Sequence, residues 1–225
     1  MNRWGEKRYH SMDYDLKELY GEKVYKITLN GGMTCPNRDG KVGHGGCIFC
    51  SAAGSGDFAG SATCSITKQL AMGKENLTKK RPVHSYIAYF QAFTNTYAPV
   101  EYLRQIYMEA IQDPDVQILS IATRPDCLPD DVLQLLEEIN QIKPVWVELG
   151  LQTIHPQTAT YIRRGYPLEV FEEAVYNLRK RNISVITHTI LGLPGENEDM
   201  MLETIDYLNK MDIQGIKLQL LHILK

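Results

Sequence analysis

Short apolar runs rich in β-branched and aromatic residues alternate along the chain with stretches of helical spacing. The runs begin at Val24 and near His84, Gln117, Val145, Ser184 and Ile216. Strands that alternate with helices form a mostly parallel sheet joined by right-handed crossovers. Ligands of such sheets bind beyond the carboxyl ends of the strands. We therefore expect an α/β protein whose functional residues directly follow strands.

Residue types typical of helix starts support this alternation. Pro99 opens one amphipathic stretch, and the segment from Pro129 to Asp131 opens another. The segment from Asn197 to Asp199 places acidic side chains on the first turn of a third helix. Proline fits the start of a helix, and acidic side chains there are stabilised by the helix dipole. A further helix is expected at about residues 65–80.

The length of the chain limits how far the sheet can close. Its 225 residues end directly after the sixth apolar run, with five helical regions between the six expected strands. A closed eight-stranded barrel of this type typically needs ~250 residues. We therefore expect a polar leader over residues 1–23 and one domain over residues 24–225, without a full ring and lacking its C-terminal portion.

Charge and apolar patterning exclude several classes of protein. The formal net charge of -3 and a pI near 6.1 argue against a strongly basic coat for nucleic acid. The first residues carry no apolar signal segment, and the longest apolar stretches fall far short of the ~18 residues of a membrane span. With five cysteines, an odd number, we expect a cytoplasmic protein with reduced thiols.

Three cysteines in a glycine-rich loop over residues 31–60 carry the strongest chemical signal. Cys35, Cys47 and Cys50 follow the first strand with the spacing C-x11-C-x2-C. Structural zinc normally takes four ligands, and His44 is an uncertain fourth. Three thiolates fit an iron-sulfur cluster that leaves one iron open to another ligand. A noncatalytic zinc scaffold or RNA-binding module remains the alternative.

This loop resembles that of the radical S-adenosylmethionine (radical SAM) superfamily, in which Phe49 fills the aromatic place before the last cysteine. The usual superfamily spacing is C-x3-C-x2-C, so the first gap is longer here. In this gap and in the segments CPNRDG, GGC and FC, the loop is similar to that of the YtqA/YhcC-like family. Residues 122–126, 148–153 and 191–196 also resemble family segments, in the expected order. The resemblance therefore covers nearly the whole chain.

The resemblance implies a partial (βα)6 TIM-like barrel, a 4Fe-4S cluster held by the three cysteines, and S-adenosyl-L-methionine (SAM) bound at the open iron. The implied activity is reductive cleavage of SAM to a 5′-deoxyadenosyl radical that abstracts a substrate hydrogen. An enzyme of this kind needs an electron donor, so we expect a flavodoxin or ferredoxin as a partner. We expect no membrane partner.

Contacts to SAM are assigned by the same resemblance to residues that follow the later strands. Thr94, Asn95 and Thr96 would approach the methionine part, although an ordinary polar turn also explains them. Arg164, which follows the fourth strand, is the first choice for binding the methionine carboxylate of SAM, and Arg124, after the third strand, is a weaker one. The alternative is a solvated arginine at a helix end.

The fourth and fifth strands complete this set. Trp146, Glu148, Gly150 and Gln152 share one face by the period of two, so two polar groups point where a barrel interior lies. By resemblance Gln152 contacts the sugar or methionine region of SAM, and Glu148 contacts SAM or orients the substrate; a structural network is the alternative. His188 corresponds to the ribose position, or is a satisfied core residue. The turn at Gly192 would let the backbone approach the adenine.

For the substrate, the resemblance points to tRNA and to remodelling of an aminomethyl-type side chain on the wobble uridine. The runner-up within the same class is a coproporphyrinogen-oxidase-like or elongator-like enzyme. Cys64 and Cys127 are expected to be packing residues, since free cysteine commonly behaves as a small buried apolar residue.

Overall fold

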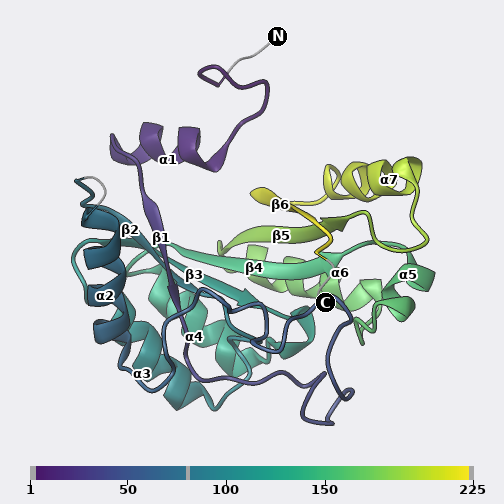
Figure 1. Ribbon diagram of the computed structural model, residues 1–225, viewed down its shortest axis with the longest axis horizontal. Coiled ribbons are helices and arrows are strands. Elements are labelled where there is room, and N and C mark those ends of the chain that lie inside the picture. Colours follow the sequence, from purple (N-terminus) through teal and green to yellow (C-terminus); the bar gives the residue numbers. More distant parts are fainter. Residues whose placement is uncertain (1–3, 80–81, 223–225) are drawn as a thin grey trace.

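The computed structural model describes residues 4–79 and 82–222 and shows strands and helices in alternation (Figure 1). The strands are β1 (Tyr25–Leu29), β2 (Tyr86–Phe90), β3 (Val116–Thr123), β4 (Val145–Gln152), β5 (Ser184–Leu191) and β6 (Gly215–Leu220). The helices are α1 (Met12–Tyr20), α2 (Ile66–Thr78), α3 (Val100–Ile111), the short 3-10 turn η1 (Pro125–Cys127), α4 (Asp130–Asn140), α5 (Pro156–Tyr161), α6 (Leu168–Arg179) and α7 (Glu198–Leu208).

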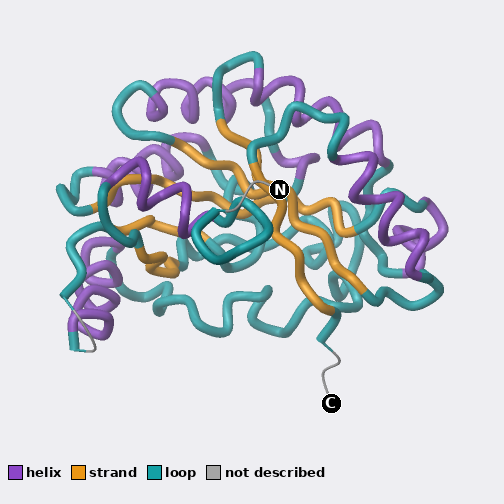
Figure 2. Tube along the Cα trace, turned by 90° about the horizontal axis from the view of Figure 1, so that it is seen from above, coloured by secondary structure: helices purple, strands orange, loops and turns teal. Residues whose placement is uncertain are grey.

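The six strands form one parallel sheet in the order of the sequence, from β1 to β6. Each crossover places a helix on the outer side of the sheet, where α2 packs on β1, α3 on β3, and α6 on β4 and β5. Figure 2 shows the strands in an arc with helices along its outer side. The expected α/β architecture of parallel strands and crossover helices is confirmed.

The two edge strands show how strongly the sheet is curved. Lys26 of β1 and Lys217 of β6 lie three and two strands away from Glu148 of β4, yet their amino groups are 2.5 and 3.6 Å from its carboxylate oxygens. Neighbouring strands lie about 4.8 Å apart, so a flat sheet would keep these side chains much farther away. The sheet is therefore a partial (βα)6 barrel that encloses its inner face.

Alternation along β4 separates the apolar core from the barrel interior. Val147, Leu149 and Leu151 point outward and are buried against the helices, where they join Phe171 and Leu178 of α6. The even-numbered residues, including Glu148, face the interior, as the period of two predicts. The main core therefore lies between sheet and helices, and the interior is left for polar side chains.

Helix starts follow the residues that the sequence marks. Pro99 and Pro129 precede the first helical residues of α3 and α4, and the Asn197 side chain caps α7 by accepting from the Met200 backbone N–H at 3.0 Å. Between β4 and β5 the structure has two helices where one helical region is expected. The chain reverses between them at Arg163 and Gly165, which have φ values of 56° and 82°.

The leader contains a helix, α1, that begins at its cap Ser11 and ends at Gly21 with a φ of 73°. Leu16 of this helix is buried against Ile87 of β2 and Ile118 of β3. These two strand residues precede inward-facing Tyr89 and Ser120 by two positions. The helix therefore closes the barrel interior at the amino ends of the strands, away from the carboxyl ends where the site is expected.

Among the described residues, none of the helices has the length and apolar character needed to cross a bilayer.

Leu149 tests the importance of the outer core. We expect Leu149→Ala to lower the free energy of unfolding by about 3 kcal/mol, because it leaves a cavity at a fully buried site. The matched control Leu202→Ala, on α7 at 55% exposure, should change it by less than roughly 0.5 kcal/mol. Urea unfolding followed by circular dichroism measures both, and equal losses would contradict the placement of the core.

Candidate functional site

A cavity of about 560 Å³ opens at the carboxyl ends of the strands. Residues of the loop over 31–60 form one wall, and inward-facing residues of β2 to β6 form the floor and the opposite wall. In Figure 1 this loop runs from the end of β1 past the ends of the later strands. The functional residues therefore gather where parallel strands place their ligand sites.

All three cysteines of the loop line this cavity. Cys35, Cys47 and Cys50 are partly buried and carry free thiols. Asn37 donates from Nδ2 to the Cys47 sulfur at 3.4 Å and to the Arg163 carbonyl at 2.6 Å, so it joins the loop to the segment after β4. Burial raises the pKa of the Cys47 thiol to about 11. Metal binding at this sulfur therefore releases a proton.

Arg38 holds the second half of the loop. Its guanidinium donates to the backbone carbonyls of Cys50 at 3.2 Å and of Ser51 at 2.6 Å, and it stacks over the Phe93 ring at 5.4 Å. Gly46 has a φ of 81°, and a Cβ there would come within 2.8 Å of the Arg38 Nε. The CPNRDG segment thus contributes a cysteine and two side chains that shape the loop.

The three thiols fit an iron-sulfur cluster. They share one wall of the cavity with Phe49, which is partly buried and packs against Ile162 and Ile190. Among the described residues, no three His, Cys, Asp or Glu side chains already stand at the spacing of ligands to one metal ion. The thiolates of a cubane bind different irons, so a wider spacing suits it. His44 packs over Gly40 instead of lining this cavity.

The floor of the cavity is built around the carboxylate of Glu148, whose side chain has no exposed area. Its Oε1 accepts from Lys26 Nζ at 2.5 Å and from Ser120 Oγ at 2.6 Å. Its Oε2 lies 2.6 Å from His188 Nε2 and 3.6 Å from Lys217 Nζ. These partners come from β1, β3, β5 and β6. One carboxylate therefore connects the two edges of the sheet with its centre.

Burial and charge act against each other on this floor. Burial alone would raise the pKa of Glu148, but the hydrogen bond with His188 and the charge of Lys26 outweigh it and hold that pKa well below its usual value. Burial lowers the pKa of both His188 and Lys217. Burial also raises the pKa of Tyr89 far above its usual range, so its phenol stays neutral. The carboxylate is ionised and the floor is polar.

Three residues that line the cavity have strained backbones. Ser55, Phe93 and Gln152 have φ values of 60°, 61° and 63°, where side chains other than glycine are uncommon. Gln152 lies where the pairing of β4 with β5 shifts register, and its Oε1 accepts from the Tyr166 hydroxyl at 3.3 Å. Such strain gathers at sites where the surrounding structure fixes a side chain in a working position.

The structure brings together the aromatic residue of the loop and five of the expected SAM contacts. These cavity-lining residues are Phe49, Thr94, Arg124, Glu148, Gln152 and His188. Arg124 is held by a two-pronged ion pair with Asp126, at 2.9 and 2.7 Å. The shared face expected for Glu148 and Gln152 is therefore present, and its polar groups meet the thiols of the loop across one cavity.

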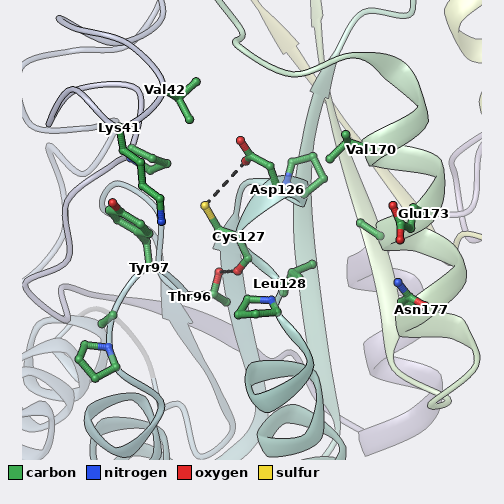
Figure 3. Close-up of a pocket in the computed structure, with 16 residues that line it drawn as sticks. Lys41, Val42, Thr96, Tyr97, Asp126, Cys127, Leu128, Val170, Glu173 and Asn177 are labelled. Atoms are coloured by element: carbon green, nitrogen blue, oxygen red, sulfur yellow. Dashed lines mark hydrogen bonds between the residues drawn. The ribbon is translucent and has the colours of Figure 1, made fainter.

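Four other expected contacts do not line it. Asn95 is buried and donates to the Ala122 carbonyl at 2.8 Å. Thr96 donates to the Cys127 carbonyl and belongs to a second cavity of about 710 Å³ on the far side of η1 (Figure 3). Gly192 has a φ of 78° that serves the turn after β5. In this structure these three residues do not line the cavity, and their assignment as SAM contacts stays a prediction.

Arg164, the fourth of these, departs furthest from the expectation. It is only 2% exposed, and its guanidinium donates to the carbonyls of Tyr166, Leu151 and Thr153 at 3.0, 2.9 and 2.7 Å. The chain folds back after α5 and turns this side chain toward the end of β4, so its donors satisfy backbone carbonyls there. In this structure Arg164 supports the end of β4, and of the two arginines expected at the SAM carboxylate it is Arg124 that lines the cavity.

Sequence reasoning did not find four members of the floor: Lys26, Tyr89, Ser120 and Lys217. The sequence does carry a signal for the two lysines. Each lies within a short strand, at a position whose side chain points to the inner face of the sheet. A charged side chain in such a position is costly unless it is paired. What no pattern shows is that both lysines meet the same carboxylate, because they are far apart in the chain.

Comparison with known proteins agrees with this geometry. The family model for the radical SAM superfamily matches residues 35–208, which begin at the first cysteine of the loop. The chain belongs to the radical SAM superfamily. Its relatives include YtqA of Bacillus subtilis, 54% identical over 220 residues, covering 98% of this chain and 68% of that protein. YhcC of Escherichia coli K12 is 44% identical over 212 residues, covering 94% and 67%.

The place in the YtqA/YhcC-like family within this superfamily is thereby confirmed. Solved structures with the same fold include the archaeal Elp3 of Methanocaldococcus infernus, with a TM-score of 0.62 and 17% identity over 87% of this chain. The coproporphyrinogen III oxidase of Escherichia coli matches with a TM-score of 0.60 and 14% identity over 96% of it. The chain spans 45% and 48% of those two proteins, and the likeness shows the barrel fold.

Glu148→Gln tests whether the floor depends on one buried charge. We expect the free energy of unfolding to fall by about 3 kcal/mol at pH 7, because Lys26 loses its buried partner. The folded pKa of Glu148 lies below its value of 4.5 in the unfolded chain, so its contribution is complete above that value. The contribution disappears as the pH falls through the folded pKa, and the gap between the two proteins should close there.

The matched control is Glu138→Gln, which removes an exposed partner of Arg104 at 2.7 Å and should cost less than about 1 kcal/mol. Urea unfolding across a pH series measures all three proteins. A Glu148→Gln protein as stable as the parent at pH 7 would rule out the central role of this carboxylate.

Proposed function

We propose that Cys35, Cys47 and Cys50 hold a 4Fe-4S cluster in this chain and that the opposite wall of the same cavity binds SAM. The observation that carries the proposal is the meeting of three free thiols with a polar, strand-end wall in one cavity of about 560 Å³. Such a cluster with SAM supplies reductive cleavage of SAM and abstraction of a substrate hydrogen. A noncatalytic zinc module does not account for the polar wall across the cavity.

The residues of the chain have definable tasks in this proposal. Arg124, fixed by Asp126, presents a cation for a carboxylate, and Gln152 is held in place by Tyr166. Thr94, buried to 1% exposure, offers a hydroxyl beside the loop. Phe49 adds an apolar surface beside the thiols. Together these side chains orient a bound molecule against the loop, which is the positioning that radical chemistry requires.

The cysteine assignment is tested by single alanine substitutions. After anaerobic reconstitution, the parent protein should bind about four irons and four sulfides and form 5′-deoxyadenosine from SAM when it is reduced. Cys35→Ala, Cys47→Ala and Cys50→Ala should each lose most of the iron and all detectable product. Metal analysis, absorption spectra and chromatography of the products measure these changes.

Cys64→Ala is the matched control, because Cys64 is also a partly buried free thiol but does not line the cavity. It should retain iron and activity. Stoichiometric zinc in the anaerobically prepared parent, with no SAM cleavage, would contradict the proposed function.

We further propose that the substrate is tRNA and that the reaction remodels an aminomethyl-type side chain on the wobble uridine. Support comes from a relative with a tRNA-related name, the human mitochondrial tRNA methylthiotransferase CDK5RAP1, which is 30% identical over 101 residues and covers 44% of this chain and 17% of that protein. A wobble base is reachable when it is splayed out into a pocket. The polar cavity at the strand ends is the pocket that would receive it.

Cells that lack the protein test the tRNA proposal. We expect their tRNA to accumulate the precursor of one wobble-uridine modification and to lose its product, as measured by mass spectrometry of digested nucleosides. Expression of the parent protein or of Cys64→Ala should restore the product, whereas Cys50→Ala should not. A wobble-uridine profile identical with and without the protein would refute tRNA as the substrate.

The proposal also requires a source of single electrons. We propose a flavodoxin or ferredoxin in the reducing cytoplasm, because low-potential clusters are reduced by such carriers. The five free cysteines are compatible with that compartment.

A further inference from the structure

The floor of the cavity carries more positive than negative charge. Lys26 and Lys217 approach Glu148 from opposite edges of the sheet, and Glu148 is the carboxylate that both share. Lys26 takes the close position at 2.5 Å, and Oε1 also accepts from Ser120. The second oxygen is engaged by His188 at 2.6 Å. Lys26, Ser120 and His188 therefore take most of the hydrogen bonds that the Glu148 carboxylate can accept, and Lys217 does not.

Lys217 is left with a long ion pair and with Tyr89, a neutral hydrogen-bond partner whose ring centre is 5.1 Å from the amino group. Its amino group is 3.6 Å from Glu148 Oε2 and donates to the Tyr89 hydroxyl at 3.2 Å. Because the phenol of Tyr89 stays neutral, this bond does not compensate the charge of the ammonium. The side chain is 35% exposed, and the exposed part lines the cavity. Burial also lowers the pKa of Lys217, as expected for an under-compensated cation.

The surroundings of Lys217 favour an anion in this position. Gln219 lies two residues further along β6 on the same face and also lines the cavity, so an amide stands next to the ammonium. The two other cations around the cavity already have partners. Arg124 pairs with Asp126, and Arg38 binds backbone carbonyls. Asp57, an anion of the cavity lining, lies on the outer loop and accepts from the Ser51 hydroxyl at 2.9 Å.

We propose that Lys217, together with Gln219, binds an anionic group of the substrate, a carboxylate or a phosphate, at the β6 side of the cavity. An ammonium with three donors and a neighbouring amide can meet two oxygens of such a group. Glu148 and Tyr89 position the lysine without neutralising it. This inference rests on the proposed function, since it assigns the class of substrate that the same cavity accepts.

The test uses the reconstituted protein with SAM bound, and inorganic phosphate and acetate as probes. Lys217→Met keeps most of the side-chain volume and removes the charge, and Lys217→Arg keeps the charge. We expect Lys217→Met to weaken binding of the probes by about tenfold or more, since it removes the charge-assisted hydrogen bonds to the anion. Lys217→Arg should stay within about threefold of the parent. Isothermal titration measures the dissociation constants.

Two controls show whether an effect of Lys217→Met comes from the missing charge at the cavity. The alternatives are a general effect of removing a surface charge and a failure of the variant to fold. Lys68→Met removes an exposed lysine on α2, outside the cavity, and should leave binding of the probes unchanged. Thermal unfolding shows whether Lys217→Met folds as the parent does, which is expected because Glu148 keeps Lys26 and His188. If Lys217→Met binds phosphate and acetate as tightly as the parent does, the inference is overturned.

A separate measurement distinguishes the substrate from SAM, whose methionine part also carries a carboxylate. The affinity for SAM should be the same in Lys217→Met and the parent protein. An equal loss of SAM affinity would assign the lysine to SAM and overturn its role toward the substrate. Failure of the cluster proposal is visible independently, as absence of iron and of 5′-deoxyadenosine from the parent protein, whereas the difference in probe binding between the parent and Lys217→Met reports on Lys217.

Discussion

The carboxylate of Glu148 is the interaction on which the shape of the barrel interior depends. It draws Lys26 and Lys217 from the two edge strands, and Ser120 and His188 from the strands beside its own. A buried carboxylate is costly unless it is paired and hydrogen-bonded. The curvature of the sheet brings these partners close to Glu148. Their ion pairs and hydrogen bonds in turn hold the inner faces of separate strands together. The floor of the cavity and the partial closure of the barrel are thus two results of one arrangement.

The wall opposite this floor is organised in a different way, through side chains that bind backbone carbonyls. Asn37 ties the loop to the Arg163 carbonyl, Arg38 ties its two halves together, and Arg164 supports the end of β4. A long loop has few backbone partners of its own, so such contacts fix the thiols in place. Strained Phe93 and Gln152 lie where this wall meets the strands. Rigidity of the cavity therefore comes from polar contacts around it.

Local patterns were sufficient to predict much of this molecule. Helix starts at Pro99, Pro129 and Asn197 depend on neighbouring residues, and they lie where the sequence places them. The inward face of Glu148 and Gln152 follows from the geometry of a strand. Arg164 could not be placed in this way, because a two-helix connection turns it toward backbone carbonyls. Thr96 likewise follows a strand but faces the second cavity across η1.

The sequence by itself determined the parallel α/β class and the cysteine loop after the first strand, because these depend on periodicity and on spacing between near neighbours. The residues of that loop also carry the resemblance to the family. Only the tertiary structure decided which polar residues share a site. Lys26 and Lys217 stand at opposite ends of the domain in sequence, and they meet at Glu148 only because the sheet curves. Strand curvature is a property of the whole sheet and its packed helices, so no local pattern encodes the charge that results on the cavity floor.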